Sequence, residues 1–513
     1  MGSEMCIRDR GNAAIKYEHL RKGWVGSMLT VRGVEQVRAV QKIAVEETRL
    51  GIPLIIGFDV IHGYKTLSPI PLAEAASWDM QAIRKSAETA AAEASASGIN
   101  WTFGPMVDIS RDARWGRVME GAGEDPFLGA KVAEARVKGF QGDTRADLAK
   151  PTTIAACAKH FAAYGFAEAG RDYNTVDISN STLYNAVLPP FEAAKNAGVR
   201  TFMNSFNVLN GVPATGSSFL QRDILKGKWG FDGFVITDWA SIREMIKWGH
   251  AKDGADASQK AVTAGADMDM ESHLYVYELV KLVQEGKVDV KLIDDAVRRI
   301  LRVKFELGLF DDPYRYCNEK REKEVIGSKA SHESVLDMAK KSIVLLKNEN
   351  NLLPLKKTGQ KIAVIGSLAA DKNSPLGSWR IAADDNTAVS VLEGLQQYKG
   401  NTLTYEKGAE LTVNKATFLD EVVYNTTDRS GFEAAKNAAK NADVVVMVLG
   451  EHGFSSGEGR SRTNLDLPGL QQELLEEIYK VNKNIVLVLN NGRPLSITLS
   501  LIHISEPTRR TPI

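Results

Sequence analysis

Short apolar segments alternate with helix-forming segments from about residue 50 to residue 270. The apolar segments are typical of buried β-strands and occupy residues 53–58, 99–105, 153–161, 199–206, 233–238 and 265–270. Helical spacing and composition mark residues 81–96, 182–198 and 290–308. Repeated strand–helix units predict a parallel sheet with helices outside it. Over residues 11–312 they favour a (β/α)8-type TIM barrel with an incomplete start, and an open doubly wound sheet is the alternative.

A second α/β unit follows a break in this pattern. Residues 307–325 contain Gly, Pro and a run of charges that predicts a solvated linker, and we assign residues 313–356 to a linker and a helix. Strands are expected at residues 361–367, 401–408, 442–452 and 484–494. Helices are expected between them, at residues 389–398, 431–442 and 470–481. The unit over residues 357–499 therefore reads as a smaller open parallel sheet.

The two ends of the chain do not continue the neighbouring pattern. Residues 1–10 and 501–513 resemble translated sequencing-adaptor sequence, so both segments are left out of the fold prediction. The first segment lacks the charged-then-apolar order of a signal peptide. We expect the natural protein to extend in both directions, which would leave the second sheet incomplete and with an unpaired edge.

Composition narrows the classes of function. Lys+Arg and Asp+Glu both number 64, so no global field attracts nucleic acid or an anionic membrane, and a neutral ligand fits better. No apolar run approaches the roughly 20 residues of a membrane helix. The three cysteines are too few for a disulfide framework and have no metal-ligand spacing.

Several charged residues follow predicted strands, where a parallel barrel places its active face. Asp238 ends one strand and is followed by Trp239, which suits a carboxylate beside a sugar ring; a helix N-cap is the alternative. Lys159 and His160 end another strand and could bind hydroxyl groups, although a lone His is often a satisfied core residue.

Other candidates lie in polar segments with the same ambiguity. Residues 111–126 are rich in Arg and acidic side chains, and Asp59 and Asp79 could be turn or cap residues instead of ligands. The Gly/Ser-rich segment 451–462 contains Glu451 and Glu458. A mobile loop can deliver a general acid into a cleft, and a solvated surface loop is the alternative.

Five motifs occur in one order: GFDVIHG (57–63), NWTFGPMVDISRDARWGR (100–117), AACAKHFAAYG (155–165), GFVITDWAS (233–241) and SGEGRSR (456–462). Over residues 11–499 the chain resembles glycoside hydrolase family 3, in particular its bacterial periplasmic β-glucosidase type. The resemblance implies a TIM-barrel first domain, an α/β sandwich second domain and a pocket between them.

The resemblance also implies roles for individual residues. Asp238 is expected to be the nucleophile and Glu458 the general acid/base, with Glu451 as the competing acid. Substrate binding is expected from Asp59, Asp79, Arg117, Lys159, His160, Arg171, Met203, Phe206 and Trp239. Many relatives have Tyr where Phe206 stands. The implied activity is that of a retaining exo-β-glucosidase that needs no cofactor or metal, acts on β-linked glucosides, and is periplasmic or secreted.

Other functions remain open at this stage. A β-xylosidase uses similar carboxylates, whereas a β-N-acetylglucosaminidase of the same family would need a His that is missing after KHF. A nucleotide-binding protein is disfavoured because KIAVIGSLAAD lacks G-x-G-x-x-G. A non-catalytic sugar-binding protein is disfavoured by the intact Asp238 and Glu458. The sequence does not determine the linkage, the aglycone or the oligomeric state.

Overall fold

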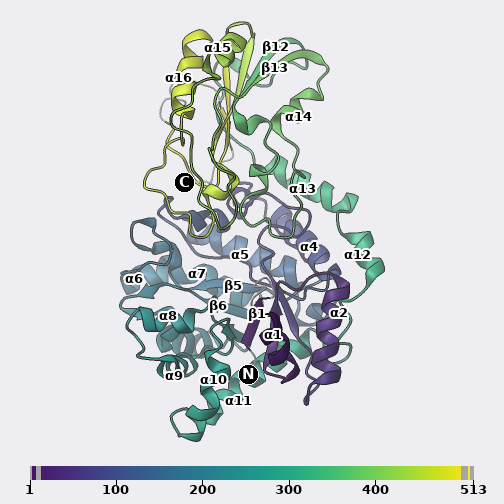
Figure 1. Cartoon of the computed structure of the whole chain (residues 1–513), viewed down its shortest axis with the longest axis vertical. Helices are drawn as coiled ribbons and strands as arrows, with labels where there is room; N and C mark the ends of the chain where they lie inside the picture. Colours follow the sequence, from purple (N-terminus) through teal and green to yellow (C-terminus); the bar gives the residue numbers. More distant parts are fainter. Residues whose placement is uncertain (1–2, 7–12, 498–505, 509–513) are drawn as a thin grey trace.

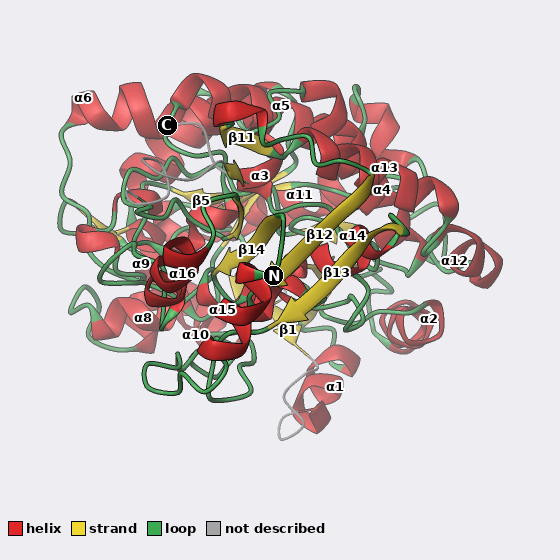
Figure 2. Cartoon of the chain, turned by 90° about the horizontal axis from the view of Figure 1, so that it is seen from above, coloured by secondary structure: helices red, strands yellow, loops and turns green. Residues whose placement is uncertain are grey.

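The protein consists of two α/β units stacked one on the other (Figure 1). The computed structural model describes residues 3–6, 13–497 and 506–508. The purple-to-teal part of the chain forms the lower unit in Figure 1, and the green-to-yellow part forms the upper unit. Figure 2 shows the same arrangement from above, with the sheet of the second unit lying over the helices of the first.

Eight parallel strands form the centre of the first unit: β1 (Ser3–Cys6), β2 (Val25–Leu29), β3 (Ile55–Phe58), β4 (Trp101–Thr102), β5 (Cys157–Phe161), β6 (Thr201–Asn204), β9 (Phe234–Ile236) and β10 (Asp269–Met270). They pair in two groups, β10-β1-β2-β3-β4 and β5-β6-β9. Parallel bridges Trp101↔Ala155 and Ile236↔Met268 join the groups at both ends. Each strand therefore has a neighbour on both sides, and a short hairpin, β7 (Val208–Leu209) and β8 (Val212–Pro213), lies apart from them.

Helices follow most of these strands: α1 (Ala13–Arg21), α2 (Val34–Lys42), α3 (Pro71–Ala75), α4 (Met80–Ala96), α5 (Pro126–Gln141), α6 (Asn180–Thr182), α7 (Leu188–Asn196), a helical segment at Phe219–Lys228, α8 (Ser241–Lys247), α9 (Gly254–Ala264), α10 (Leu274–Gln284) and α11 (Val290–Glu306). Helix α4 begins where Asp79 accepts from the N–H groups of Gln81 and Ala82. The buried face of α11 includes Ala296 and Ile300, at the helical spacing that the sequence predicted.

Strand side chains alternate between two apolar clusters, as the period of two requires. Met28, Ile56 and Phe202 pack in the large cluster that includes the surrounding helices. Ile55 and Met203 point the other way, into a second cluster. The first unit therefore has apolar packing on both faces of its strands, which is typical of parallel sheets.

A connecting segment with α12 (Glu319–Val325) and α13 (Lys329–Lys341) leads to the second unit. Its strands are β11 (Val344–Lys347), β12 (Thr358–Ile365), β13 (Gly400–Glu406), β14 (Val444–Gly450), β15 (Ile485–Asn490) and β16 (Glu506–Thr508), in the order β11-β16-β15-β14-β12-β13. Its helices are α14 (Val391–Gln396), α15 (Phe432–Lys440) and α16 (Gln471–Val481). Alternate residues of β14 pack into two clusters, so apolar residues cover both faces of this sheet.

The predicted elements are largely confirmed, and the differences include strand β11, which falls where a linker and a helix were expected. Strand β2 was not predicted, because WVGSML is short and interrupted by Gly and Ser. The charged segment predicted as linker includes helix α12, although none of the α12 residues is buried. The expected unpaired edge beside β15 is wrong, since β16 pairs with β15.

Two strands fall within the terminal segments that the sequence analysis set aside. β1 lies between β10 and β2, and β16 lies between β11 and β15. The other residues of segments 1–10 and 501–513 lie outside the described residues. The origin proposed for these segments stays a prediction.

Backbone hydrogen bonds dock the two units. The N–H of Gly457 donates to the carbonyl of Gly116 at 2.7 Å, and that of Arg462 donates to the carbonyl of Arg114 at 3.0 Å. The buried Arg493 guanidinium donates across the same boundary to the Arg114 carbonyl at 2.9 Å. A Cβ atom built on Gly116 would lie 2.3 Å from the carbonyl oxygen of Gly457, so this approach requires glycine.

We expect Gly116→Ala to lower the free energy of unfolding by about 2 kcal/mol, because backbone on both sides of the contact must shift. Gly394→Ala is the matched control, since a Cβ at Gly394 meets nothing within 4 Å. Chemical denaturation of both variants measures the difference. Equal stability of the two would show that this contact does not constrain docking.

Candidate active site

Asp238 lies just beyond strand β9, at the end where the β3, β5 and β6 strands also finish. Its Oδ1 atom accepts from the N–H of Trp239 at 2.7 Å, and its own N–H donates to Oδ1 of Asn204 at 3.3 Å. Its Oδ2 atom is buried without a hydrogen-bond partner among the described residues. Helix α8 has Ala240 at its N-cap, so the alternative that Asp238 caps a helix is wrong.

His160 faces Asp238 from strand β5. Its Nε2 atom lies 3.7 Å from Oδ2 of Asp238, and its Nδ1 atom lies 2.9 Å from Oδ2 of Asp108. The backbone N–H of His160 also donates to this Asp108 oxygen, at 2.8 Å. Burial holds the pKa of His160 well below its usual range, so the ring is neutral at pH 7. Asp108 therefore fixes the orientation of a neutral imidazole.

Two cations lie beside these groups. Lys159 Nζ is 3.4 Å from Oδ1 of Asp59 and 5.2 Å from the centre of the Trp379 ring, which the second unit contributes. Arg117 is buried and bound by Glu120 through two hydrogen bonds, of 2.9 and 3.1 Å. This bidentate pairing fixes the guanidinium plane.

Glu458 enters from the loop between β14 and α16. Its Oε1 atom accepts from the Tyr173 hydroxyl at 2.6 Å and lies 3.6 Å from Nη1 of Arg117. The pKa of Asp238 is raised to about 7, mainly by burial and also by the charge of Glu458, while Arg117 and Lys159 act to lower it. Arg117 thus acts on carboxylates from both units.

Polar atoms without partners gather around Asp238. Of the buried side-chain atoms that have no hydrogen-bond partner in the described part of the chain, five belong to residues of this site: His160 Nε2, Asp238 Oδ2, Asn204 Nδ2, Tyr164 Oη and Trp379 Nε1. The Tyr164 ring lies 5.2 Å from His160, and Arg117 lies 5.5 Å from Tyr164 and 5.9 Å from Trp379. Unpaired buried polar groups are costly, so this cluster suits a ligand with several hydroxyl groups.

The other residues predicted to bind substrate lie in different surroundings. Phe206 contacts Tyr164 and Tyr173 at the site, Met203 packs in the core beneath it, and Trp239 is 45% exposed beside Asp238. Asp79 caps α4 and pairs with Lys341 Nζ at 2.9 Å, which places it among structural residues. Arg171 is exposed to solvent, next to Asp172 and Tyr173. The structure therefore uses Asp79 as a helix cap, whereas the binding role of Arg171 stays a prediction.

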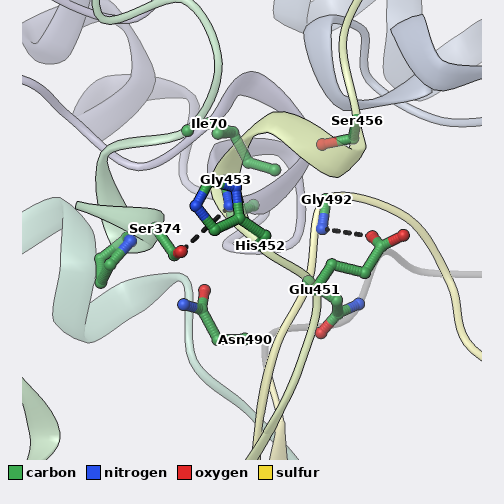
Figure 3. A pocket seen from close by; sticks show the side chains of 12 residues that line it. Ile70, Ser374, Glu451, His452, Gly453, Ser456, Asn490 and Gly492 are labelled. Carbon is green, nitrogen blue, oxygen red and sulfur yellow. Dashed lines mark hydrogen bonds between the residues drawn. The ribbon is translucent and has the colours of Figure 1, made fainter. Parts of the chain in front are cut away.

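Glu451, the competing acid, is held in another pocket of the unit boundary (Figure 3). Its Oε1 atom pairs with Arg462 at 2.9 Å and Arg493 at 3.0 Å, and its Oε2 atom accepts from the N–H of Gly492 at 3.2 Å. Both of its oxygens are engaged by the protein. In Glu458, by contrast, only Oε1 has a hydrogen bond or ion pair with the residues that the structure describes.

Sequence reasoning missed Asp108, Asn204, Tyr173 and Trp379. Asp108 and Tyr173 lie in or beside segments that were singled out, and Asn204 ends the predicted strand β6, so its polar side chain at a strand end was a usable signal. Nothing local distinguishes Trp379, because its role comes from docking of the second unit.

Models of two domains match almost the whole chain. The glycosyl hydrolase family 3 N-terminal domain matches residues 8–303, and the family 3 C-terminal domain matches residues 343–504. The chain belongs to glycoside hydrolase family 3. Its α/β fold with two units is consistent with these two matches.

Relatives in this family support the same assignment. The chain is 40% identical over 501 residues to a periplasmic β-glucosidase of Salmonella typhimurium, covering 95% of this chain and 65% of that protein. It is 35% identical to a β-xylosidase of Formosa agariphila, covering 90% and 65%. A β-glucosidase from Listeria innocua solved with glucose is 36% identical, with a TM-score of 0.90, covering 99% of this chain and 70% of that one. The family 3 chain thus spans about two thirds of the length of these relatives.

The raised pKa of Asp238 makes stability depend on pH. The folded family 3 chain binds the proton of Asp238 more tightly than the unfolded chain does. The contribution of Asp238 to the free energy of unfolding is therefore complete below about pH 4 and is lost as the pH rises through about 7. Asp238→Asn keeps a neutral group at all pH values. Between about pH 4 and pH 8, we expect the free energy of unfolding of this variant to rise by on the order of 2 kcal/mol relative to that of the natural protein. Urea unfolding across this range measures the gain.

Asp79→Asn is the control with the opposite sign. A hydrogen bond from Lys341 lowers the pKa of Asp79, so its contribution is complete above the ordinary value of 3.8 and is lost only below it. Asp79→Asn should have a lower free energy of unfolding than the natural protein, and this difference should stay nearly constant from about pH 5 to pH 8. Parallel curves for Asp238→Asn and the natural protein would contradict the raised pKa.

Proposed function

We propose that this chain carries the catalytic part of a retaining β-glucosidase that removes terminal non-reducing β-D-glucosyl residues. The cluster of unpaired buried polar atoms around Asp238 is the observation that carries the proposal. A pyranose ring supplies hydroxyl groups that can pair with such atoms, and Trp379 offers an aromatic surface for its apolar face. Asp59, Lys159 and Arg117 add charged partners at the same place.

Asp238 acts as the nucleophile through Oδ2. Oδ1 is held by the N–H of Trp239, whereas Oδ2 is unpaired and faces His160. Oδ2 bonds to the anomeric carbon as the bond to the leaving oxygen breaks, which forms a glycosyl–enzyme intermediate. The positive charges of Arg117 and Lys159 favour the ionised carboxylate that this step needs.

Glu458 acts as the general acid and then as the base. It gives its proton to the leaving oxygen in the first step. In the second step it takes a proton from water, whose oxygen bonds to the anomeric carbon as the bond from that carbon to Oδ2 of Asp238 breaks. Retention requires the two carboxyl groups to lie about 5–5.5 Å apart. Arg117 supports this arrangement, because its Nη1 atom lies 3.6 Å from Oε1 of Glu458 and its charge also lowers the pKa of Asp238.

The preference for glucosides rests on the relatives. The Listeria innocua β-glucosidase has structures with glucose, isofagomine and gluconolactone, and a mutant of it has one with laminaribiose. A β-xylosidase is the second candidate, because xylosidases occur among relatives of similar identity. Both activities use the same two carboxylates.

The architecture of the two units and the location of the protein also belong to this proposal. The pairing of eight parallel strands at both edges supports a (β/α)8-type barrel for the first unit. The clusters on both faces of the second sheet support an α/β sandwich.

A periplasmic location rests on the name of the Salmonella typhimurium relative. None of the helices that the structure describes has the length and apolar character to cross a membrane.

Asp238→Ala and Glu458→Ala test the two roles. We expect the first to reduce kcat by a factor on the order of 10³ or more, because no nucleophile remains. The second should reduce kcat/KM for an unactivated glucoside about 10²–10⁴-fold. Azide should rescue Glu458→Ala on an activated aryl glucoside, with β-glucosyl azide as the product. Wild-type turnover by either variant would overturn that assignment.

Substrate preference has a separate test. We expect a higher kcat/KM for 4-nitrophenyl β-glucoside than for the corresponding xyloside, measured on one preparation. A higher value for the xyloside would favour the second candidate while leaving both catalytic assignments intact.

A further inference from the structure

Residues 170–173 of the first unit bind the Glu458 loop through both backbone and side chains. The Asp172 Oδ2 atom accepts from the N–H of Gly459 at 2.7 Å, directly after Glu458. The N–H of Asp172 donates to Oγ of Ser461 at 3.0 Å, and Ser461 donates to the carbonyl of Gly170 at 2.7 Å. The acidic residue is thus bracketed by contacts that cross the unit boundary.

Tyr173 supplies the contact to the carboxylate itself. Its hydroxyl donates to Oε1 of Glu458 at 2.6 Å, which is short and charge-assisted when Glu458 is ionised. Its ring packs edge-on against Phe206, with 5.1 Å between ring centres, and lies 6.4 Å from Tyr164. The phenol is therefore oriented by the wall of the site.

Asp172 also fixes the base of this segment. Its Oδ1 atom accepts from Nε1 of the buried Trp115 at 2.9 Å. Trp115 directly precedes Gly116, whose carbonyl accepts from the N–H of Gly457. One connected set of hydrogen bonds therefore runs from Trp115 to both sides of Glu458.

The two oxygens of Glu458 have different surroundings. Oε1 accepts from Tyr173 and lies 3.6 Å from Nη1 of Arg117. Oε2 has no hydrogen bond or ion pair with the residues that the structure describes, and the side chain is 24% exposed. When the acid is neutral, its proton lies on Oε2, because Oε1 already accepts an O–H donor.

We propose that Tyr173 is a positioning residue for Glu458, holding Oε1 so that Oε2 carries the exchanged proton and faces the leaving oxygen. The inference rests on the proposed acid/base role of Glu458. In the first step the O–H bond at Oε2 breaks as the proton moves to the leaving oxygen, and Oε2 takes a proton from water in the second. The Tyr173 proton stays on the phenol throughout. Burial and the Glu458 charge raise the pKa of Tyr173, so the phenol remains a donor.

Tyr173→Phe removes the hydroxyl and keeps the ring that packs on Phe206. We expect kcat/KM for cellobiose or an alkyl glucoside, which need a proton on the leaving oxygen, to fall about 10–100-fold. For 2,4-dinitrophenyl glucoside, whose leaving group needs no proton, the loss should be less than about threefold. The dependence of kcat/KM on leaving-group pKa should therefore steepen. Tyr184→Phe is the matched control, because Tyr184 is an exposed tyrosine 40% accessible to solvent, and it should leave both values unchanged.

The double variant Tyr173→Phe/Glu458→Ala distinguishes a positioning role of Tyr173, which acts through Glu458, from a role as a structural tether. If Tyr173 acts through Glu458, adding Tyr173→Phe to Glu458→Ala should cost no further activity on the unactivated substrate. Equal losses on both substrates, or additive losses in the double variant, would overturn the positioning role and indicate a structural tether. Wild-type turnover by Glu458→Ala would instead overturn the proposed function. A melting temperature for Tyr173→Phe close to that of the natural protein checks that the units remain docked.

Discussion

Docking of the loop around Glu458 against the first unit is the contact on which the rest of the site depends. The loop is held by the Gly116 carbonyl before Glu458 and by the Asp172 carboxylate after it. These are short hydrogen bonds to backbone, which restrict position more strongly than long side chains do. A carboxylate that comes from a separate unit can be placed no more accurately than that unit is docked. Catalysis requires its groups to be placed with errors well below 1 Å.

The electrostatics of the site depend on the same docking. Arg117 is fixed by Glu120 within the first unit, yet it acts on both Asp238 and Glu458. Burial disfavours a charge on Asp238, whereas Arg117 and Lys159 partly restore it. The site is therefore a place where the fold holds an acidic group at some cost to stability, as catalytic sites commonly do.

The candidate site was predictable where function follows from a position next to a strand. Asp59 and Asp238 follow parallel strands, and Lys159 and His160 lie near the end of another parallel strand, β5. The ends of these strands meet at one face. Asp79 lies between helices α3 and α4, and its side chain caps α4. No local pattern separates a capping Asp from a ligand Asp, since both residues precede a helix.

The sequence by itself determined the two α/β units, most of their strands and helices, and membership of glycoside hydrolase family 3. This was possible because hydrophobic periodicity and short motifs are local properties of the chain. The tertiary structure decided that both oxygens of Glu451 are bound by the protein, that Asp108 orients His160, and that Tyr173 contacts Glu458. These choices join residues far apart in the chain, and they depend on how strand ends converge and how two separately folded surfaces pack, which no local pattern records.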